Sequence, residues 1–242
     1  MPERKRDRIQ VTEEMGLRSA PEQLEALKTA DEATHCLVYL IEELNQFHQD
    51  ESPFAKIQQA SGTIMAMAYR SARACILVIA AGYVPESFPL KRRVSEAVLL
   101  VEHITADIYG TRATEWLEGR KPSLGKLTAK KPERAQILNR YSTGAHIDLR
   151  TLPRQAMVSR LGGERAKGFP LSGTREPELA NHLLIELAIE CRKLAYDFAW
   201  YVLDREIGGG SDTRTLFEKL EAELDSLVPR LYPATIPEDD AE

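Results

Sequence analysis

The feature that most restricts the fold of this chain is a repeat of apolar residues at every third or fourth position. The clearest example follows Pro177, where one stripe contains Leu179, Leu183, Leu187, Cys191, Leu194, Phe198 and Val202. Residues with this spacing share one face of an α-helix, and that face must pack against another apolar surface. The sequence therefore predicts a long packed helix that ends at the three glycines 208–210.

The same spacing predicts an all-α fold for the rest of the chain. We expect a helical bundle of five to seven helices, including segments 21–49, 53–81, 84–107 and 131–145 and a short helix around Trp116. Proline and glycine interrupt the pattern at 147–174, which favours a long loop or a small β-hairpin insertion. Gly144 is expected to end helix 131–145 as a left-handed C-cap.

The predicted domain organisation follows from where the helical pattern begins and ends. Residues 21–207 form the helical bundle domain, and residues 211–230 form a C-terminal helix with a narrow leucine stripe. Residues 1–20 are charged and lack periodicity, so we expect a disordered N-terminal segment, and residues 231–242 form a solvated acidic tail.

Composition restricts the class of protein. The chain has 242 residues with 43% apolar content, which is enough to bury a full core. Cys36, Cys75 and Cys191 are far apart within apolar helical stretches, so we interpret them as reduced core residues. No apolar region follows the charged N-terminus, and the apolar run 75–84 is too short to cross a bilayer. We therefore expect a cytoplasmic protein that does not enter the membrane.

Charge is distributed unevenly along the chain. Residues 1–110 carry 12 Lys and Arg against 16 Asp and Glu, residues 111–170 carry 13 against 5, and residues 171–242 carry 7 against 16. The basic middle block could attract phosphate, and Lys130, Lys131 and Arg134 are the candidate phosphate- or RNA-binding residues. The alternative is that this block pairs with the acidic C-terminal helices.

One ion pair is predicted from helix packing. If segments 53–81 and 84–107 form an antiparallel hairpin, Arg70 and Arg73 lie at the level of Glu96. An arginine within a mostly apolar helix needs a carboxylate partner. We therefore expect a structural ion pair between Glu96 and Arg70 or Arg73.

Several kinds of chemical site are not indicated. The chain has no glycine-rich phosphate loop of the Walker or Rossmann type. A di-metal site in a helical bundle commonly uses two Glu-x-x-His pairs, and only Glu32–His35 has that spacing. His182, Glu186 and Glu190 share one helix face, which we interpret as a solvated polar face. We expect neither a metal nor a cofactor.

Arg140 and His146, near the end of segment 131–145, form the strongest candidate catalytic pair. Histidine can accept the proton of a 2′-hydroxyl near neutral pH, and arginine can hold a phosphate and stabilise its developing charge. The two side chains converge only if the helix ends at Gly144 and lets His146 fold back. The alternative is structural, with Arg140 paired to an acidic neighbour and His146 either capping the preceding helix or hydrogen-bonded to a backbone carbonyl.

The arrangement Arg, five residues, His resembles the motif of the HEPN superfamily, which are all-helical domains. The chain also resembles a group of bacterial helical proteins over about residues 60–205, through the segments 69–73, Gly82-Tyr83, Arg93-x-x-Glu96, Trp116-Leu117 and 141–146. The resemblance implies a homodimer that brings two such sites together. It favours a module that binds nucleotide, RNA or a partner protein. A metal-independent ribonuclease of the toxin or phage-defence type, using Arg140 and His146, and a non-catalytic helical scaffold are the alternatives.

Overall fold

A computed structural model of the chain describes residues 3–44, 52–145 and 177–203, together with five isolated positions between 218 and 229. Within these residues the fold is all-α, as the periodicity predicts. The helices are α1 (Glu3–Gln23), α2 (Leu27–Leu44), α3 (Pro53–Ala80), the 3-10 helix η1 (Pro85–Ser87), α4 (Phe88–Thr105), α5 (Thr111–Leu117), α6 (Leu124–Thr128), α7 (Pro132–Ala145) and α9 (Pro177–Leu203).

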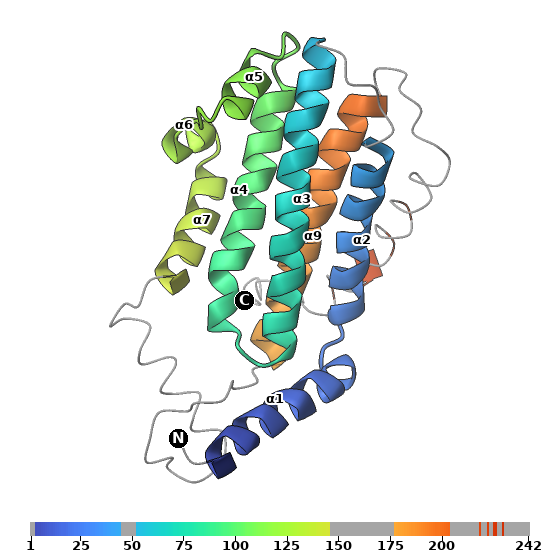
Figure 1. The fold of residues 1–242 in the computed structure, drawn as a ribbon, viewed down its shortest axis with the longest axis vertical. Coiled ribbons are helices and arrows are strands. Elements are labelled where there is room, and N and C mark those ends of the chain that lie inside the picture. Colours follow the sequence, from blue (N-terminus) through green and yellow to red (C-terminus); the bar gives the residue numbers. More distant parts are fainter. Residues whose placement is uncertain are drawn as a thin grey trace, which may run out of the picture.

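Four long helices form the centre of the molecule. Helix α3 packs against α2 and α4, and α9 packs against both α2 and α4, so the four helices close a ring around one apolar core (Figure 1). Most of the stripe predicted after Pro177 lies in this core, including Leu183, Leu187, Leu194 and Phe198. Helices α5, α6 and α7 form an outer layer beside α3 and α4 (Figure 1).

The ends of α3 show why the chain turns where it does. The Ser52 hydroxyl accepts a hydrogen bond of 3.1 Å from the backbone N–H of Ala55, and Pro53 occupies the first helical position. At the other end Gly82 has a φ of 92°, and the N–H of Tyr83 donates to the carbonyl of Val78. This is the pattern of a glycine C-cap, and it directs the chain back into α4.

The N-terminal segment differs from the expectation. Residues 3–20 were expected to be disordered, but they belong to α1, which lies obliquely below the four-helix ring (Figure 1). Helix α1 continues through Pro21, and the chain breaks between Gln23 and Leu27 rather than before Pro21. Burial of Ala20 and Leu24 in the main core supplies the packing that a helix with weak periodicity lacks by itself.

The predicted partner of Glu96 is also corrected. Arg73 on α3 pairs with Asp31 on α2, and Glu96 accepts a hydrogen bond of 2.8 Å from Arg92 on its own helix. Arg70 is exposed, so water can solvate its charge without a carboxylate. The hairpin itself is present, but Arg73 faces α2 and not α4.

Several predicted features lie outside the described residues. They are the loop or hairpin at 147–174, the acidic tail at 231–242 and most of the helix at 211–230. Helix α7 contains Gly144 and is described as far as Ala145, so the helix does not end at Gly144 as predicted.

Among the described helices, α3 has the length and apolar composition of a possible membrane span. Half of the most apolar 18-residue stretch of α3 is buried inside the bundle. A core helix has the same length and apolar composition, because its side chains contact other helices.

We predict that Gly110→Ala lowers stability more than Gly119→Ala. Both glycines have positive φ, 69° and 88°, but a Cβ at Gly110 would lie 2.8 Å from the carbonyl oxygen of Pro53, whereas nothing lies within 4 Å of one at Gly119. A residue with a Cβ at positive φ costs about 1 kcal/mol in each variant. At Gly110 the steric clash with the Pro53 backbone adds about 1–2 kcal/mol. Urea unfolding measures both. Equal losses of unfolding free energy would show that the residue before α5 does not pack tightly against the start of α3.

Candidate functional site

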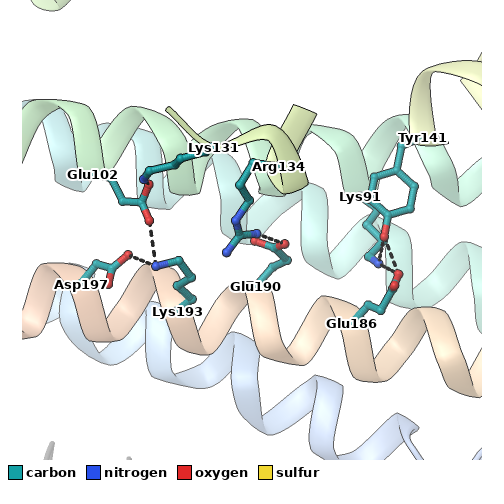
Figure 2. Close-up of polar contacts among 9 residues, drawn as sticks. All are labelled: Lys91, Glu102, Lys131, Arg134, Tyr141, Glu186, Glu190, Lys193 and Asp197. Atoms are coloured by element: carbon teal, nitrogen blue, oxygen red, sulfur yellow. Dashed lines mark hydrogen bonds and ion pairs between the residues drawn. The ribbon is translucent and has the colours of Figure 1, made fainter. Parts of the chain in front are cut away.

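A cavity of about 550 Å³ lies between α4, α7 and α9. Helix α4 contacts both α7 and α9, and side chains from the three helices meet across this space, which we call the groove. Most of its lining is charged, and the complete set is Lys91, Glu102, Lys131, Glu133, Arg134, Ile137, Tyr141, Glu186, Ile189, Glu190 and Lys193. Figure 2 shows that most of the charged residues form three groups in a row along α9.

The first group joins one residue from each helix. Lys91 of α4 has a side chain only 1% exposed, and its ammonium donates hydrogen bonds to the hydroxyl of Tyr141 and the carboxylate of Glu186. The Tyr141 hydroxyl also donates to Glu186, which closes a triangle (Figure 2). The Lys91 Nζ lies 4.3 Å from the centroid of the Tyr141 ring. The Nε2 atom of His182, on the same helix, lies 3.2 Å from Oε1 of Glu186.

Burial and pairing act on this first group in opposite directions. Burial lowers the pKa of Lys91, and the neighbouring Glu186 only partly offsets this effect. Burial also disfavours the Glu186 carboxylate, but the charge of Lys91 and hydrogen bonds from Lys91 and Tyr141 outweigh it and hold the Glu186 pKa below its ordinary value. We conclude that Glu186 is ionised and that its negative charge stabilises the protonated form of Lys91.

The second group is an ion pair between Arg134 of α7 and Glu190 of α9. Their side chains are 16% and 7% exposed. Arg134 donates to Oε1 of Glu190, whereas Oε2 is buried and accepts no hydrogen bond from the described residues. Burial raises the pKa of Glu190 in spite of the adjacent guanidinium. Glu190 is therefore an incompletely satisfied carboxylate in the wall of the groove.

The third group lies at the more exposed end of the groove. Glu102 of α4 pairs with Lys131 and, at 2.7 Å, with Lys193 of α9, which also lies 3.0 Å from Asp197 (Figure 2). Burial opposes ionisation of Glu102, but the hydrogen bonds from both lysines outweigh it and lower its pKa. Lys131 and Lys193 are 37% and 33% exposed, so this end is open to a ligand.

Helical spacing aligns these groups. Glu186, Glu190, Lys193 and Asp197 are separated by four, three and four residues, so they lie on one face of α9. Arg134 and Tyr141 are seven residues apart on α7, and Lys91 and Glu102 are eleven apart on α4. On each helix these polar residues recur at the three- or four-residue spacing of a helix face, as core apolar residues do. The three polar faces meet at the groove.

The predicted catalytic pair is only partly described. Arg140 lies in α7, but its side chain is outside the described part of the structure, and His146 lies outside it entirely. Arg140 directly precedes Tyr141, so the helix that carries Arg140 is one wall of the groove.

The three predicted phosphate-binding residues have different environments. Lys131 and Arg134 line the groove and pair with Glu102 and Glu190. Lys130 is exposed and is not among the residues that line the groove. The alternative that the basic block pairs with acidic residues thus holds for Arg134, whose partner is in the C-terminal part of the chain.

The most buried members of the site are not evident from the sequence pattern. The face with His182, Glu186 and Glu190 was expected to be solvated, but Glu190 is buried and Glu186 is half-buried, because α4 and α7 cover that face. Lys91 was not singled out at all. The available signal was its position three residues before Val94, which places it in the core stripe of α4.

The three cysteines behave as predicted. All are buried and unpaired by disulfides. Burial raises the pKa of the Cys36 thiol to about 11 and that of Cys75 to about 12, so both stay protonated and are poor nucleophiles at neutral pH.

In the part of the chain that the structure describes, no group of three or more His, Cys, Asp and Glu side chains is arranged to hold a metal ion. Comparison of the chain with protein-family models, curated proteins and solved structures finds no match.

We predict that Glu186→Leu destabilises the protein by about 3 kcal/mol, because it leaves the buried ammonium of Lys91 without a counter-charge. Adding Lys91→Met should restore most of the loss. The defect should shrink as pH rises toward 10.5. Without Glu186, which raises the Lys91 pKa against the effect of burial, the Lys91 pKa falls further than in the wild type, so the folded variant releases this proton at a lower pH and regains stability relative to the wild type.

Glu96→Leu is the matched control for this experiment. It removes a carboxylate from the more exposed pair with Arg92 on α4 and should cost about 0.5 kcal/mol. Denaturant unfolding at several pH values measures all of these variants. Equal costs for Glu186→Leu and Glu96→Leu would contradict a counter-charge role for Glu186.

Proposed function

We propose that this protein is a HEPN-like helical module that binds a nucleotide, either free or as one residue of an RNA strand, in the groove between α4, α7 and α9. The observation that carries the proposal is a cavity of about 550 Å³ whose walls hold basic and acidic side chains from three helices. This volume lies in the range of small-molecule sites.

The charges of the groove suit a ligand with two kinds of polar group. The lysines at the open end, Lys131 and Lys193, can donate to a phosphate, and the carboxylate of Glu190 can accept from a base. Both lysines already pair with Glu102, so a phosphate has to share them. We therefore expect weak binding that falls further with added salt.

A specific observation keeps the ribonuclease as a second candidate. Helix α7 places Arg140 directly before Tyr141, which lines the groove, and His146 directly follows the last residue of α7 in sequence. An RNA strand that placed one nucleotide in the groove would pass near this helix. General acid–base cleavage by such a pair requires no metal.

Lys131→Ala should weaken the binding of AMP, CMP, GMP or UMP about tenfold, equivalent to about 1.4 kcal/mol. Lys130→Ala is the matched control, because it removes the neighbouring exposed lysine outside the groove and should change affinity less than about twofold. Calorimetric titration at two salt concentrations measures both variants, and a parallel titration with a short single-stranded RNA separates free nucleotide from RNA. Absence of binding by every ligand would reject the proposal, as would equal effects of the two substitutions.

For the second candidate, the chain should cleave single-stranded RNA in the presence of a metal chelator. Arg140→Ala and His146→Ala should each reduce the rate at least about a hundredfold, as expected when a general base or a charge-stabilising group is lost. Lys130→Ala serves as the control. Gel analysis of labelled RNA measures the rates, and sedimentation of the same samples tests the homodimer that the resemblance implies. Cleavage that survives both substitutions would exclude this pair as the catalyst.

A further inference from the structure

The second oxygen of Glu190 is the one side-chain polar atom among the groove-lining residues that is both buried and without a hydrogen-bond partner in the described residues. The side chain of Glu190 is only 7% exposed, and Arg134 holds its other oxygen. A buried carboxylate oxygen is normally satisfied, because leaving it unpaired costs free energy. This oxygen therefore calls for a hydrogen-bond donor from outside the described chain.

The position of Glu190 limits what that donor can belong to. Glu190 lies between the open end, with Lys131 and Lys193, and the closed triangle around Lys91 (Figure 2). It is three residues before Lys193, which is about 4.5 Å along the axis of α9. One small ligand can therefore contact a lysine at the open end and the carboxylate in the middle.

We propose that Glu190 makes the groove specific for nucleobases that carry an exocyclic amino group. Oε2 has almost no accessible surface in the structure, so in this arrangement the side chains around Glu190 move to admit the base. The amino group then donates to Oε2 of Glu190, Arg134 holds Oε1, and the phosphate contacts Lys131 and Lys193. Adenine and cytosine present such an amino group, whereas hypoxanthine and uracil present a carbonyl oxygen at the same place. A carbonyl oxygen facing the carboxylate brings two acceptors together and makes no hydrogen bond. The inference rests on the proposed nucleotide binding.

The unaltered chain provides the first test. We expect AMP to bind at least about tenfold more tightly than IMP, and CMP at least about tenfold more tightly than UMP, because a site built to hydrogen-bond a donor rejects the analogue that lacks it. Calorimetric titration of the four nucleotides under one set of conditions measures these ratios and does not depend on the folding of any variant.

Glu190→Gln provides the second test. If Arg134 keeps donating to the remaining oxygen, the new amide group places a donor where Oε2 was, so the preference for AMP over IMP should disappear or reverse. Glu96→Gln is the matched control, because Glu96 is a carboxylate of α4 that does not line the groove, and this variant should keep the wild-type preference. Circular dichroism establishes that each variant is folded.

Each outcome has a distinct meaning. Equal binding of AMP and IMP by the unaltered chain would overturn the inference and leave nucleotide binding intact. A preference that persists in folded Glu190→Gln would also overturn it, and a water molecule would then be the simplest partner for Oε2. Binding of none of the four nucleotides would reject the proposed function itself.

Discussion

The burial of Lys91 is the interaction on which the arrangement of the outer layer depends. An ammonium group removed from water is stable only beside a carboxylate and further hydrogen-bond partners. Here Glu186 comes from α9 and Tyr141 comes from α7, so a single residue of α4 sets how far along their axes the three helices must lie. An apolar contact would tolerate a shift of one helix along another. The same shift would break the hydrogen bonds among Lys91, Tyr141 and Glu186, so these bonds favour one position of each helix along its axis.

The buried face of α4 shows how charge creates a groove in an otherwise apolar bundle. On this face Ala97, Val98 and Val101 pack in the core. Lys91 and Glu102, seven residues before and four residues after Val98, lie along the edge of the same face, and their long side chains reach toward α7 and α9. Ion pairs bridge the space between these helices without filling it, and a polar cavity results. The same charges that hold α7 in place are therefore the groups available to a ligand.

Much of the fold follows from local sequence. The start of α3 at Pro53, its end near residue 81 and the burial of the cysteines are all predicted, because helix ends and apolar stripes depend on a few neighbouring residues. The candidate site was predicted less well. Lys131 and Arg134 were identified as cations, but their partners Glu102 and Glu190 were not, since each partner lies on another helix. A helical pattern indicates which residues share a face and does not indicate which other face they meet.

The sequence by itself determined that this is an all-α protein, where helices such as α3 and α9 begin, and which apolar residues form much of its core. These properties depend on backbone hydrogen bonding and on the period of the helix, which neighbouring residues specify. Only the tertiary structure decided that Glu190 is buried, that Arg73 faces Asp31, and that Lys91 belongs to the interior. The environment of a charge depends on the helices that cover it, and those helices come from distant parts of the chain.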